Sequence, residues 1–458
     1  HEDRRCENPE HSNSSLGILR FDEAGTDNTI AVVLNYAMHG TVYGSSHGKL
    51  SGDAPRSVEL KVQEALPGNP LILFAQSWGG DMSPSAPEID GSEAGFAAEH
   101  DPKLDELEAI GRAAAESVLS VWDTIKFEED PALGFRSAHV PMSHDLLGYD
   151  DTIFPYEFGA AFCGGVSEFC PEAEKKPKMD VCIGIPEEYT LTQTRLTAMR
   201  VGSVAIVTMP GEPVTTLGEY IVEQVRANSP SMSAMLFGYA QDYTGYLLLP
   251  DDWYGGGYES ASNFWGPYQG RYLADSVISL AGNLLDPESP LSFVPVDAVD
   301  YEPGEGDAYV PERGLDLGSI SVDLPSSSEP GALLFFSWNG GDPWLDTPSV
   351  VLEKKGADGA FSTFRAGGRV VDEHDYRIAV SMTPAPTWAA EASKGGGSGR
   401  HFVWKASLRT AVQVPAPEQV LSGSFRMRVS GRGLNGEGED RSYELVSSVV
   451  SIAERDEP

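Results

Sequence analysis

The sequence predicts an α/β domain, built from a mixed sheet with helices, followed by a β-sandwich. Short apolar runs alternate with helical periodicity over residues 1–295, and beyond them helical periodicity disappears. Alternating strands and helices are typical of layered α/β folds, whereas short strands separated by turns are typical of sandwiches. We therefore predict two domains, residues 1–295 and residues 296–458.

The strands and helices of the first domain follow from the period of the apolar residues. A short apolar run indicates a buried strand, and apolar residues that recur every three to four positions indicate a helix. The predicted strands are residues 29–38, 70–75, the two runs that Gly202 separates within 196–209, and 235–239. The predicted helices are residues 56–66, 103–125, 215–227 and 271–285.

A proline-rich segment over residues 286–311 marks the seam between the domains, because prolines among acids and glycines are typical of linkers. The predicted strands beyond it are residues 332–338, 349–354, 376–382, 401–407, 423–430 and 443–452. Residues 387–400 carry a glycine run and are predicted to be a flexible loop. Residues 431–436 match GxGxxG, but no helix follows them, so we interpret them as a hairpin turn.

The charge of the chain excludes nucleic acid as a partner. Asp and Glu number 69 against 32 Lys and Arg, a formal net charge of −37. Affinity for nucleic acid comes from basic residues that neutralise phosphates. No apolar stretch approaches the roughly 18 residues that a transmembrane helix needs, so we predict no transmembrane segment. The acidic run over residues 88–108 indicates a solvated surface; the alternative is a cation site, which would hold a structural Ca²⁺ or Mg²⁺.

The four cysteines predict a disulfide-stapled loop. Three of them fall within twenty residues, in a segment rich in Gly and Pro. Their spacings, C-x6-C and C-x11-C, do not suit a thiolate zinc site as well as a disulfide. An oxidising compartment follows, so we expect a secreted, periplasmic or cell-surface protein. The cysteines are Cys6, Cys163, Cys170 and Cys182.

Polar or aromatic residues follow four of the predicted strands, at the point where each strand ends. Open α/β sheets bind their ligands at strand ends, and paired glycines let a backbone approach closely. If the strands share one sheet, these groups converge, and a histidine, a carboxylate and another oxygen donor suit zinc. The alternatives are a structural histidine and a turn-forming serine. The residues are His39, Ser83 in the Gly-Gly-Asp-Met-Ser turn, Glu212, and the pair Tyr243 and Tyr246.

The motifs at these strand ends resemble those of the neutral (non-lysosomal) ceramidase family. They are, in order, NYAMHGT with SGD, FAQSWGGDMSP, MPGEPVTTLGEYI, and YTGY with YESASNFWGP downstream. Both their order and their approximate separations match the family. The resemblance covers nearly all of the chain, and implies an α/β catalytic domain followed by an immunoglobulin-like β-sandwich. It leaves out the N-terminal third of the family's sequences.

The resemblance implies a zinc-dependent amidase that cleaves the N-acyl bond of ceramide to sphingosine and a fatty acid. Zinc lowers the pKa of a bound water from about 15.7 towards 7 and polarises the amide carbonyl. Attack by this water is favoured over attack by serine, because no histidine beside the serine in sequence would accept its proton. The resemblance implies His39, Glu212 and Tyr246 as zinc ligands, Ser83 as the catalytic serine and Tyr258 as the oxyanion donor. We also expect Gly80, Asp81 and Tyr243 to bind substrate.

The chain also departs from the family. The remaining zinc histidine of the family lies in a T-H-T-H-S-G-P motif that these 458 residues lack, so this chain offers at most three of four ligands. We expect an N-terminal fragment of the same precursor to supply the fourth. Changes at Met82, Ser85 and Pro213, with the glycine run over residues 255–257, bear on pocket shape and leave other long-chain N-acyl lipids open as substrates. The alternative function is an inactive secreted scaffold or surface-assembly protein.

Overall fold

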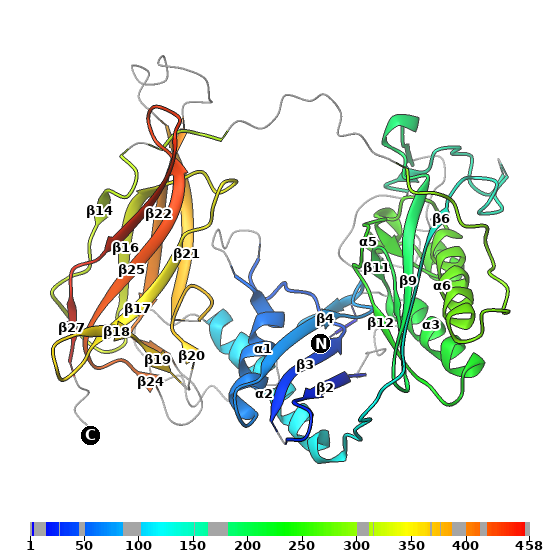
Figure 1. The fold of residues 1–458 in the computed structure, drawn as a ribbon. Helices are drawn as coiled ribbons and strands as arrows, with labels where there is room; N and C mark the ends of the chain where they lie inside the picture. Colours follow the sequence, from blue (N-terminus) through cyan, green and yellow to red (C-terminus); the bar gives the residue numbers. More distant parts are fainter. Residues whose placement is uncertain are drawn as a thin grey trace. The chain divides into compact units, whose positions relative to one another are not determined.

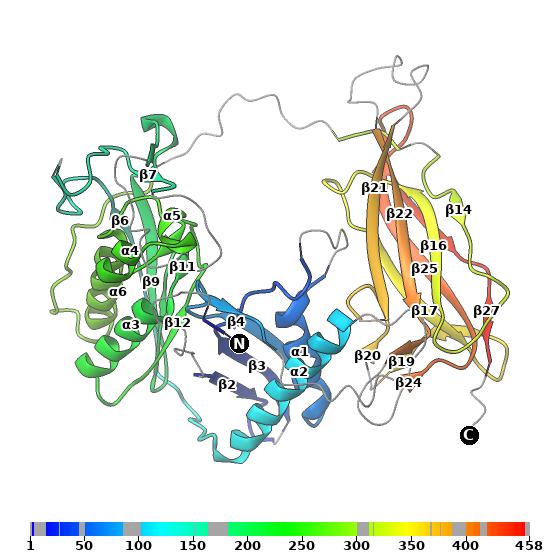
Figure 2. The same ribbon diagram turned by 180° about the vertical axis from the view of Figure 1, so that it is seen from behind.

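The structure of the chain is a computed structural model (Figure 1 and Figure 2). It describes residues 2–3, 15–26, 28–44, 51–85, 102–150, 152–163, 182–299, 311–314, 316–366, 369–375, 377–386, 400–412 and 419–453. The chain divides into two compact units. The first comprises residues 1–42, 53–88 and 109–301, and the second residues 43–52, 89–108 and 302–458.

A three-stranded sheet opens the first unit. Its strands are β2 (Gly17–Asp22), β3 (Thr29–Tyr36) and β4 (Leu71–Gln76), in the order β2-β3-β4, with β3 and β4 parallel. Helix α1 (Asp53–Ala65) connects β3 to β4 and packs on β4, and α2 (Pro102–Val121) follows. Strand β4 differs from the prediction of a buried strand. Its Leu71 and Leu73 are 56% and 45% exposed, because α1 covers only the face that carries Ile72.

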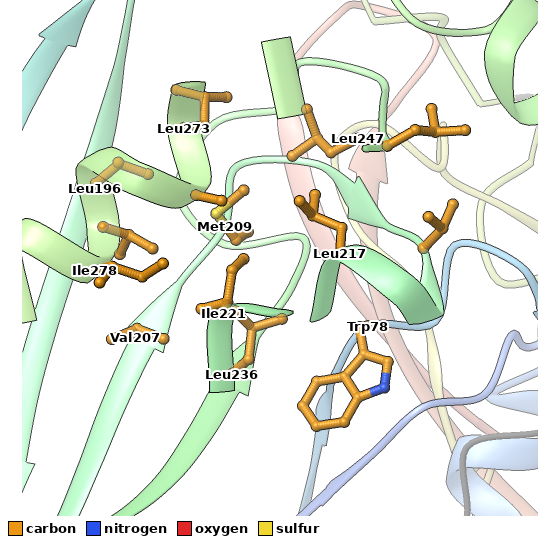
Figure 3. Packing of buried hydrophobic residues seen from close by; sticks show 14 of the residues in the cluster. Trp78, Leu196, Val207, Met209, Leu217, Ile221, Leu236, Leu247, Leu273 and Ile278 are labelled. Carbon is orange, nitrogen blue, oxygen red and sulfur yellow. The ribbon is translucent and has the colours of Figure 1, made fainter. Parts of the chain in front are cut away.

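A four-stranded sheet in the order β12-β10-β9-β6 forms the rest of the scaffold (Figure 1). Strands β10 and β12 are parallel and the other pairs antiparallel. Helices α3 and α6 pack side by side against this sheet, and the buried cluster between them includes Leu217, Leu236 and Leu273 (Figure 3). The bounds are β6 (Leu133–Pro141), β9 (Gln193–Val201), β10 (Val204–Thr208), β12 (Ser233–Phe237), α3 (Thr215–Asn228) and α6 (Gln269–Leu285).

The four strands expected to end at the site do not share one sheet, which corrects that expectation. Strands β3 and β4 belong to the three-stranded sheet, and β10 and β12 belong to the four-stranded one. The two sheets nevertheless meet at these ends. The Asn35 side-chain amide of β3 donates to the Leu236 carbonyl of β12 at 2.9 Å, and the Gly238 N–H donates to the Gln76 carbonyl at 3.1 Å. The strand ends therefore converge across two sheets.

The two main sheets of the second unit enclose one core. Among its fully buried side chains are Trp338, Trp404, Phe336 and Phe425. One sheet has the order β14-β16-β22-β21, and the other β15-β27-β25-β17-β18 with β26 on β25. The bounds are β14 (Ile320–Val322), β15 (Ser327–Ser328), β16 (Leu333–Gly340), β17 (Ser349–Lys355), β18 (Phe361–Thr363), β21 (Ile378–Pro386), β22 (Arg400–Arg409), β25 (Gly423–Leu434), β26 (Asp440–Val446) and β27 (Val450–Ile452).

The GxGxxG segment is largely strand rather than the predicted turn. Strand β25 continues through Leu434, and the hairpin turn begins at Asn435, whose carbonyl oxygen accepts the N–H of Gly438. The antiparallel pairing of β25 with β26 holds this segment extended. The predicted flexible loop lies outside the described residues, except for its last residue, Arg400.

Short elements complete the chain. They are β1 (Glu2–Asp3), β5 (Met82–Ser83), η3 (Trp122–Thr124), β7 (Ala160–Ala161), β8 (Ile183–Gly184), η5 (Glu187–Tyr189), β11 (Glu212–Pro213), β13 (Tyr246–Leu247), α4 (Pro250–Gly255), α5 (Tyr258–Ala261), β19 (Arg365–Ala366), β20 (Arg369–Val370), β23 (Ala411–Val412) and β24 (Gln419–Val420). A disulfide joins Cys163 to Cys182, and Cys6 and Cys170 lie outside the described residues. Within the described part of the chain, no helix has the length and apolar character needed to cross a membrane.

Candidate functional site

A two-stranded parallel pair, β11 with β13, places two of the candidate ligands side by side. Glu212 on β11 is in register with Tyr246 on β13, and both residues are buried. The backbone can come this close because Gly211 has no side chain: a Cβ there would lie 2.3 Å from the Gly245 carbonyl oxygen. The glycine before Glu212 thus fixes the approach of the two strands.

His39 reaches Glu212 from the other sheet. Its backbone N–H donates to the Met82 carbonyl at 2.9 Å, and its Nε2 lies 3.2 Å from the Gly80 carbonyl oxygen. The same Nε2 is 3.7 Å from Glu212 Oε2. Gly80 makes this junction possible, because its N–H donates to the Pro213 carbonyl at 3.0 Å and a Cβ would lie 2.7 Å from the Glu212 carbonyl oxygen.

Two tyrosines bind the Glu212 carboxylate. The Tyr239 hydroxyl donates to Oε2 at 2.7 Å, and the Tyr243 hydroxyl donates to Oε1 at 2.5 Å. Burial, and then the carboxylate of Glu212, raises the pKa of Tyr239 well above its usual range. Burial, and then the hydrogen bond to Glu212, also raises the pKa of Tyr243. Both phenols are therefore neutral hydrogen-bond donors at ordinary pH.

Tyr258 completes an aromatic wall beside these groups. It is the first residue of α5, after Gly257, whose φ of +98° few other residues adopt. Its ring meets the ring of Tyr246 edge to face, with 5.5 Å between the centroids. The structure thus brings together four of the predicted site residues with Gly80. The four are His39, Glu212, Tyr246 and Tyr258, and Tyr243 joins them through Glu212.

Asp81 and Ser83 lie beside this cluster in different surroundings. Asp81 is fully buried, and its carboxylate accepts hydrogen bonds from the Thr215 N–H at 2.9 and 3.1 Å and from the Thr215 hydroxyl at 2.9 Å. It therefore caps the N-terminus of α3. Ser83 is half-buried on β5, which pairs with β1, and its hydroxyl makes no hydrogen bond with any residue that the structure describes. The substrate-binding role of Asp81 and the catalytic role of Ser83 stay predictions.

The donor set at the cluster fits a zinc ion. An imidazole nitrogen, a carboxylate oxygen and a phenol oxygen are borderline-to-hard donors of the kind zinc accepts. Two ligands of a tetrahedral ion with bonds of about 2.1 Å lie about 3.4 Å apart. The separation of 3.7 Å between His39 Nε2 and Glu212 Oε2 is close to that value.

A structural Ca²⁺ or Mg²⁺ finds less support. The acidic run over residues 88–108 lies mostly outside the described residues. Among the residues that are described, Asp372, Glu373 and His374 bring three ligand atoms within 4.8 Å of one another. They lie in the second unit, and a histidine does not suit either hard cation.

Sequence reasoning missed Tyr239. Its hydroxyl lies 3.3 Å from His39 Nδ1 as well as 2.7 Å from Glu212 Oε2, so it connects the two sheets. The strand-end rule pointed to this segment but selected Tyr243 and Tyr246. A φ of +56° directs Tyr239 into the site, and a pattern of residue types does not disclose that conformation.

Comparisons with known proteins identify the fold. No protein-family model matches the sequence, and no curated protein matches it. The solved structures that match include a ceramidase complexed with C2, at a TM-score of 0.71 and 15% identity, and the neutral ceramidase from Pseudomonas aeruginosa, at 0.70 and 16%. Each match covers 98% of this chain and 73% of the other. The chain therefore has the fold of the neutral ceramidases, which confirms the resemblance seen in its motifs.

Proposed function

We propose that this chain is a zinc-dependent amidohydrolase that cleaves the N-acyl bond of ceramide or a related long-chain N-acyl lipid. The products are a free fatty acid and a sphingosine-like amine. One observation carries the proposal. His39 Nε2 and Glu212 Oε2 lie 3.7 Å apart where the two sheets meet, and the hydroxyls of two tyrosines donate to the Glu212 carboxylate. The ceramidase fold of the chain supports the choice of substrate class.

The proposed roles of the residues combine the family resemblance with their positions. His39, Glu212 and Tyr246 would hold the zinc ion. Zinc, when bound, would polarise the amide carbonyl and lower the pKa of a water molecule from about 15.7 towards about 7. The Tyr258 hydroxyl would donate to the carbonyl oxygen, where negative charge develops as the amide is attacked.

Substrate recognition would involve the mouth of the site. Tyr243 is 51% exposed while its hydroxyl donates to Glu212, so its ring lies between the buried carboxylate and the surface. A half-exposed aromatic ring suits contact with the lipid chain or amide. Gly80 would contact the substrate through its backbone, and Ser83, three residues further on, would be a further polar contact.

Further parts of the proposal concern the assembly. We assign a fourth protein ligand to a histidine of an N-terminal segment from the same precursor, and the bound water would then be a fifth ligand of the ion. The second unit would be an immunoglobulin-like domain, since its two sheets enclose one core. The Cys163–Cys182 disulfide supports an oxidising, extracytoplasmic location.

The test measures zinc and amidase activity in the native protein, including any fragment that co-purifies. Zinc content is determined by elemental analysis, and hydrolysis of an N-acylsphingosine by mass spectrometry of the released fatty acid. We expect about one zinc per site and activity that a chelator abolishes and zinc restores. Glu212→Gln should lose both, because it replaces an anionic ligand. Glu223→Gln, an exposed carboxylate on α3, is the matched control and should lose neither.

The outcomes separate the candidate functions. Metal-free protein that retains full amidase activity refutes the zinc mechanism. Protein that binds no zinc and releases no fatty acid favours the inactive scaffold instead. An intact mass that reveals a co-purifying fragment with a His-x-His motif supports the proposed fourth ligand.

A further inference from the structure

The side-chain hydroxyl of Tyr239 contacts both His39 and Glu212. Its oxygen lies 3.3 Å from His39 Nδ1 and 2.7 Å from Glu212 Oε2. Tyr243 also donates to Glu212, but through the other oxygen and, among its described contacts, without touching His39. The Tyr239 hydroxyl therefore connects two side chains that belong to different sheets.

The single proton of this hydroxyl determines which nitrogen of the His39 imidazole carries a proton. A tyrosine hydroxyl has one proton, and the shorter contact shows that it is donated to the Glu212 carboxylate. The oxygen is then an acceptor towards His39, so Nδ1 carries the imidazole proton. Nε2, which lies 3.7 Å from Glu212 Oε2 and 3.2 Å from the Gly80 carbonyl oxygen, is then the nitrogen left to bind the metal, and its contact with the Gly80 carbonyl would be exchanged for the zinc ion.

The backbone conformation of Tyr239 shows that the surrounding structure holds its side chain in place. Its φ of +56° is the left-handed conformation, which is costly for a bulky side chain and persists only where the surroundings impose it. Backbone hydrogen bonds impose it here. The Tyr239 N–H donates to the Gly211 carbonyl at 2.8 Å, and the Ala240 N–H donates to the Met209 carbonyl at 3.0 Å. These bonds anchor Tyr239 to the segment that leads into Glu212.

We propose that Tyr239 is a positioning residue of the zinc site, whose hydroxyl fixes the Nδ1–H tautomer of His39 and the orientation of the Glu212 carboxylate. It holds both ligands ready before the metal arrives. Ligating histidines commonly donate their other ring N–H to an acceptor that fixes the tautomer, and here that acceptor is itself bonded to the second ligand. The inference rests on the proposed zinc function.

The experiment compares zinc affinities by competition with a chromophoric chelator. Tyr239→Phe removes the hydroxyl and keeps the ring, and its zinc dissociation constant should rise by about 10-fold to 100-fold. Tyr243→Phe should weaken zinc less, because it frees one oxygen of one ligand. Tyr272→Phe is the matched control outside the site, where the hydroxyl donates to the Pro141 carbonyl, and it should leave zinc affinity unchanged.

The outcomes distinguish this inference from the function on which it rests. If the wild-type protein binds zinc and Tyr239→Phe binds it as tightly as Tyr272→Phe, the positioning role is wrong and the zinc site stands. If the wild-type protein binds no zinc, the proposed zinc site is wrong.

A measurement on metal-free protein then tests whether the Tyr239 hydroxyl couples His39 to Glu212, without reference to zinc. Unfolding of His39→Ala, Glu212→Gln and the double variant gives the coupling between the two residues. This coupling should shrink in a Tyr239→Phe background. A coupling energy of the same size in both backgrounds would show that the Tyr239 hydroxyl does not connect His39 to Glu212.

Discussion

Asp81, on the turn before β5, and Glu212, on β11, are buried carboxylates with different sets of hydrogen-bond donors. Asp81 is fully buried and accepts from the backbone N–H and hydroxyl of Thr215. Glu212 is 7% exposed and accepts from the phenols of Tyr239 and Tyr243. A buried charge is costly unless hydrogen bonds satisfy it, and both residues meet that condition. The donors differ in that Asp81 accepts from a backbone N–H as well as a hydroxyl, whereas both donors to Glu212 are side-chain hydroxyls.

This difference indicates what each carboxylate does. The partners of Asp81 are fixed at the N-terminus of α3, where the helix dipole also favours an anion. Val214, at the N-cap position, provides no side-chain cap, so Asp81 supplies it from a loop 134 residues earlier. Glu212 faces an imidazole and two movable hydroxyls, the surroundings in which a carboxylate can exchange a hydrogen bond for a metal. We therefore expect Asp81 to contribute mainly to stability and Glu212 to the proposed zinc site.

The largest expected effect on stability comes from removing the structural carboxylate. Asp81→Ala leaves the α3 N-terminus uncapped and buried donors unpaired, and should lower the free energy of unfolding by about 2–4 kcal/mol. Asp81→Asn keeps one acceptor and should lose less. Denaturant unfolding measures both. The comparison would break if Glu212→Ala destabilised the metal-free protein as much as Asp81→Ala does.

A smaller effect on stability is expected at Gly80, where the turn before β5 packs against β11. In Gly80→Ala the new methyl group would lie 2.7 Å from the Glu212 carbonyl oxygen, so the backbone must move apart. We expect a loss of about 1–3 kcal/mol in the free energy of unfolding, together with weaker zinc binding. The matched control is Gly282→Ala on α6, where nothing lies within 4 Å of the new Cβ. That variant should stabilise the helix by about 0.5–1 kcal/mol. Equal unfolding energies for the two variants would contradict the close packing at Gly80.

The sequence predicted individual helices and strands better than it predicted which strands pair in a sheet. Helices α1, α3 and α6 begin and end within about three residues of their predicted bounds, because their apolar residues repeat with the helical period. Strand β6 was missed, since its Leu133 and Phe135 are exposed and its pattern does not resemble a buried strand. The single sheet was wrong because a local pattern does not specify which strands pair.

The candidate site was predictable where a strand end carried a polar residue and not where a contact spans the chain. His39 and Glu212 followed from that rule, and the structure brings them together. The contact between Asp81 and the N-terminus of α3 was not predictable, because Thr215 is remote from Asp81 in sequence. Tyr239 escaped notice because its role depends on a left-handed φ, which tertiary contacts impose.

The smallest expected effect on stability comes from a variant that tests how strongly Glu212, in contrast to Asp81, depends on its hydrogen-bond donors. Tyr243→Phe removes a hydrogen bond to Oε1 from a residue that is 51% exposed, so water can replace the lost donor. We expect the free energy of unfolding to change by about 1 kcal/mol or less, and KM for an N-acylsphingosine to change more than kcat does. Thermal unfolding and steady-state kinetics on one preparation measure both. A large loss of stability in Tyr243→Phe would show that Glu212 depends on its phenols as rigidly as Asp81 depends on α3, and the distinction between the two carboxylates would fail.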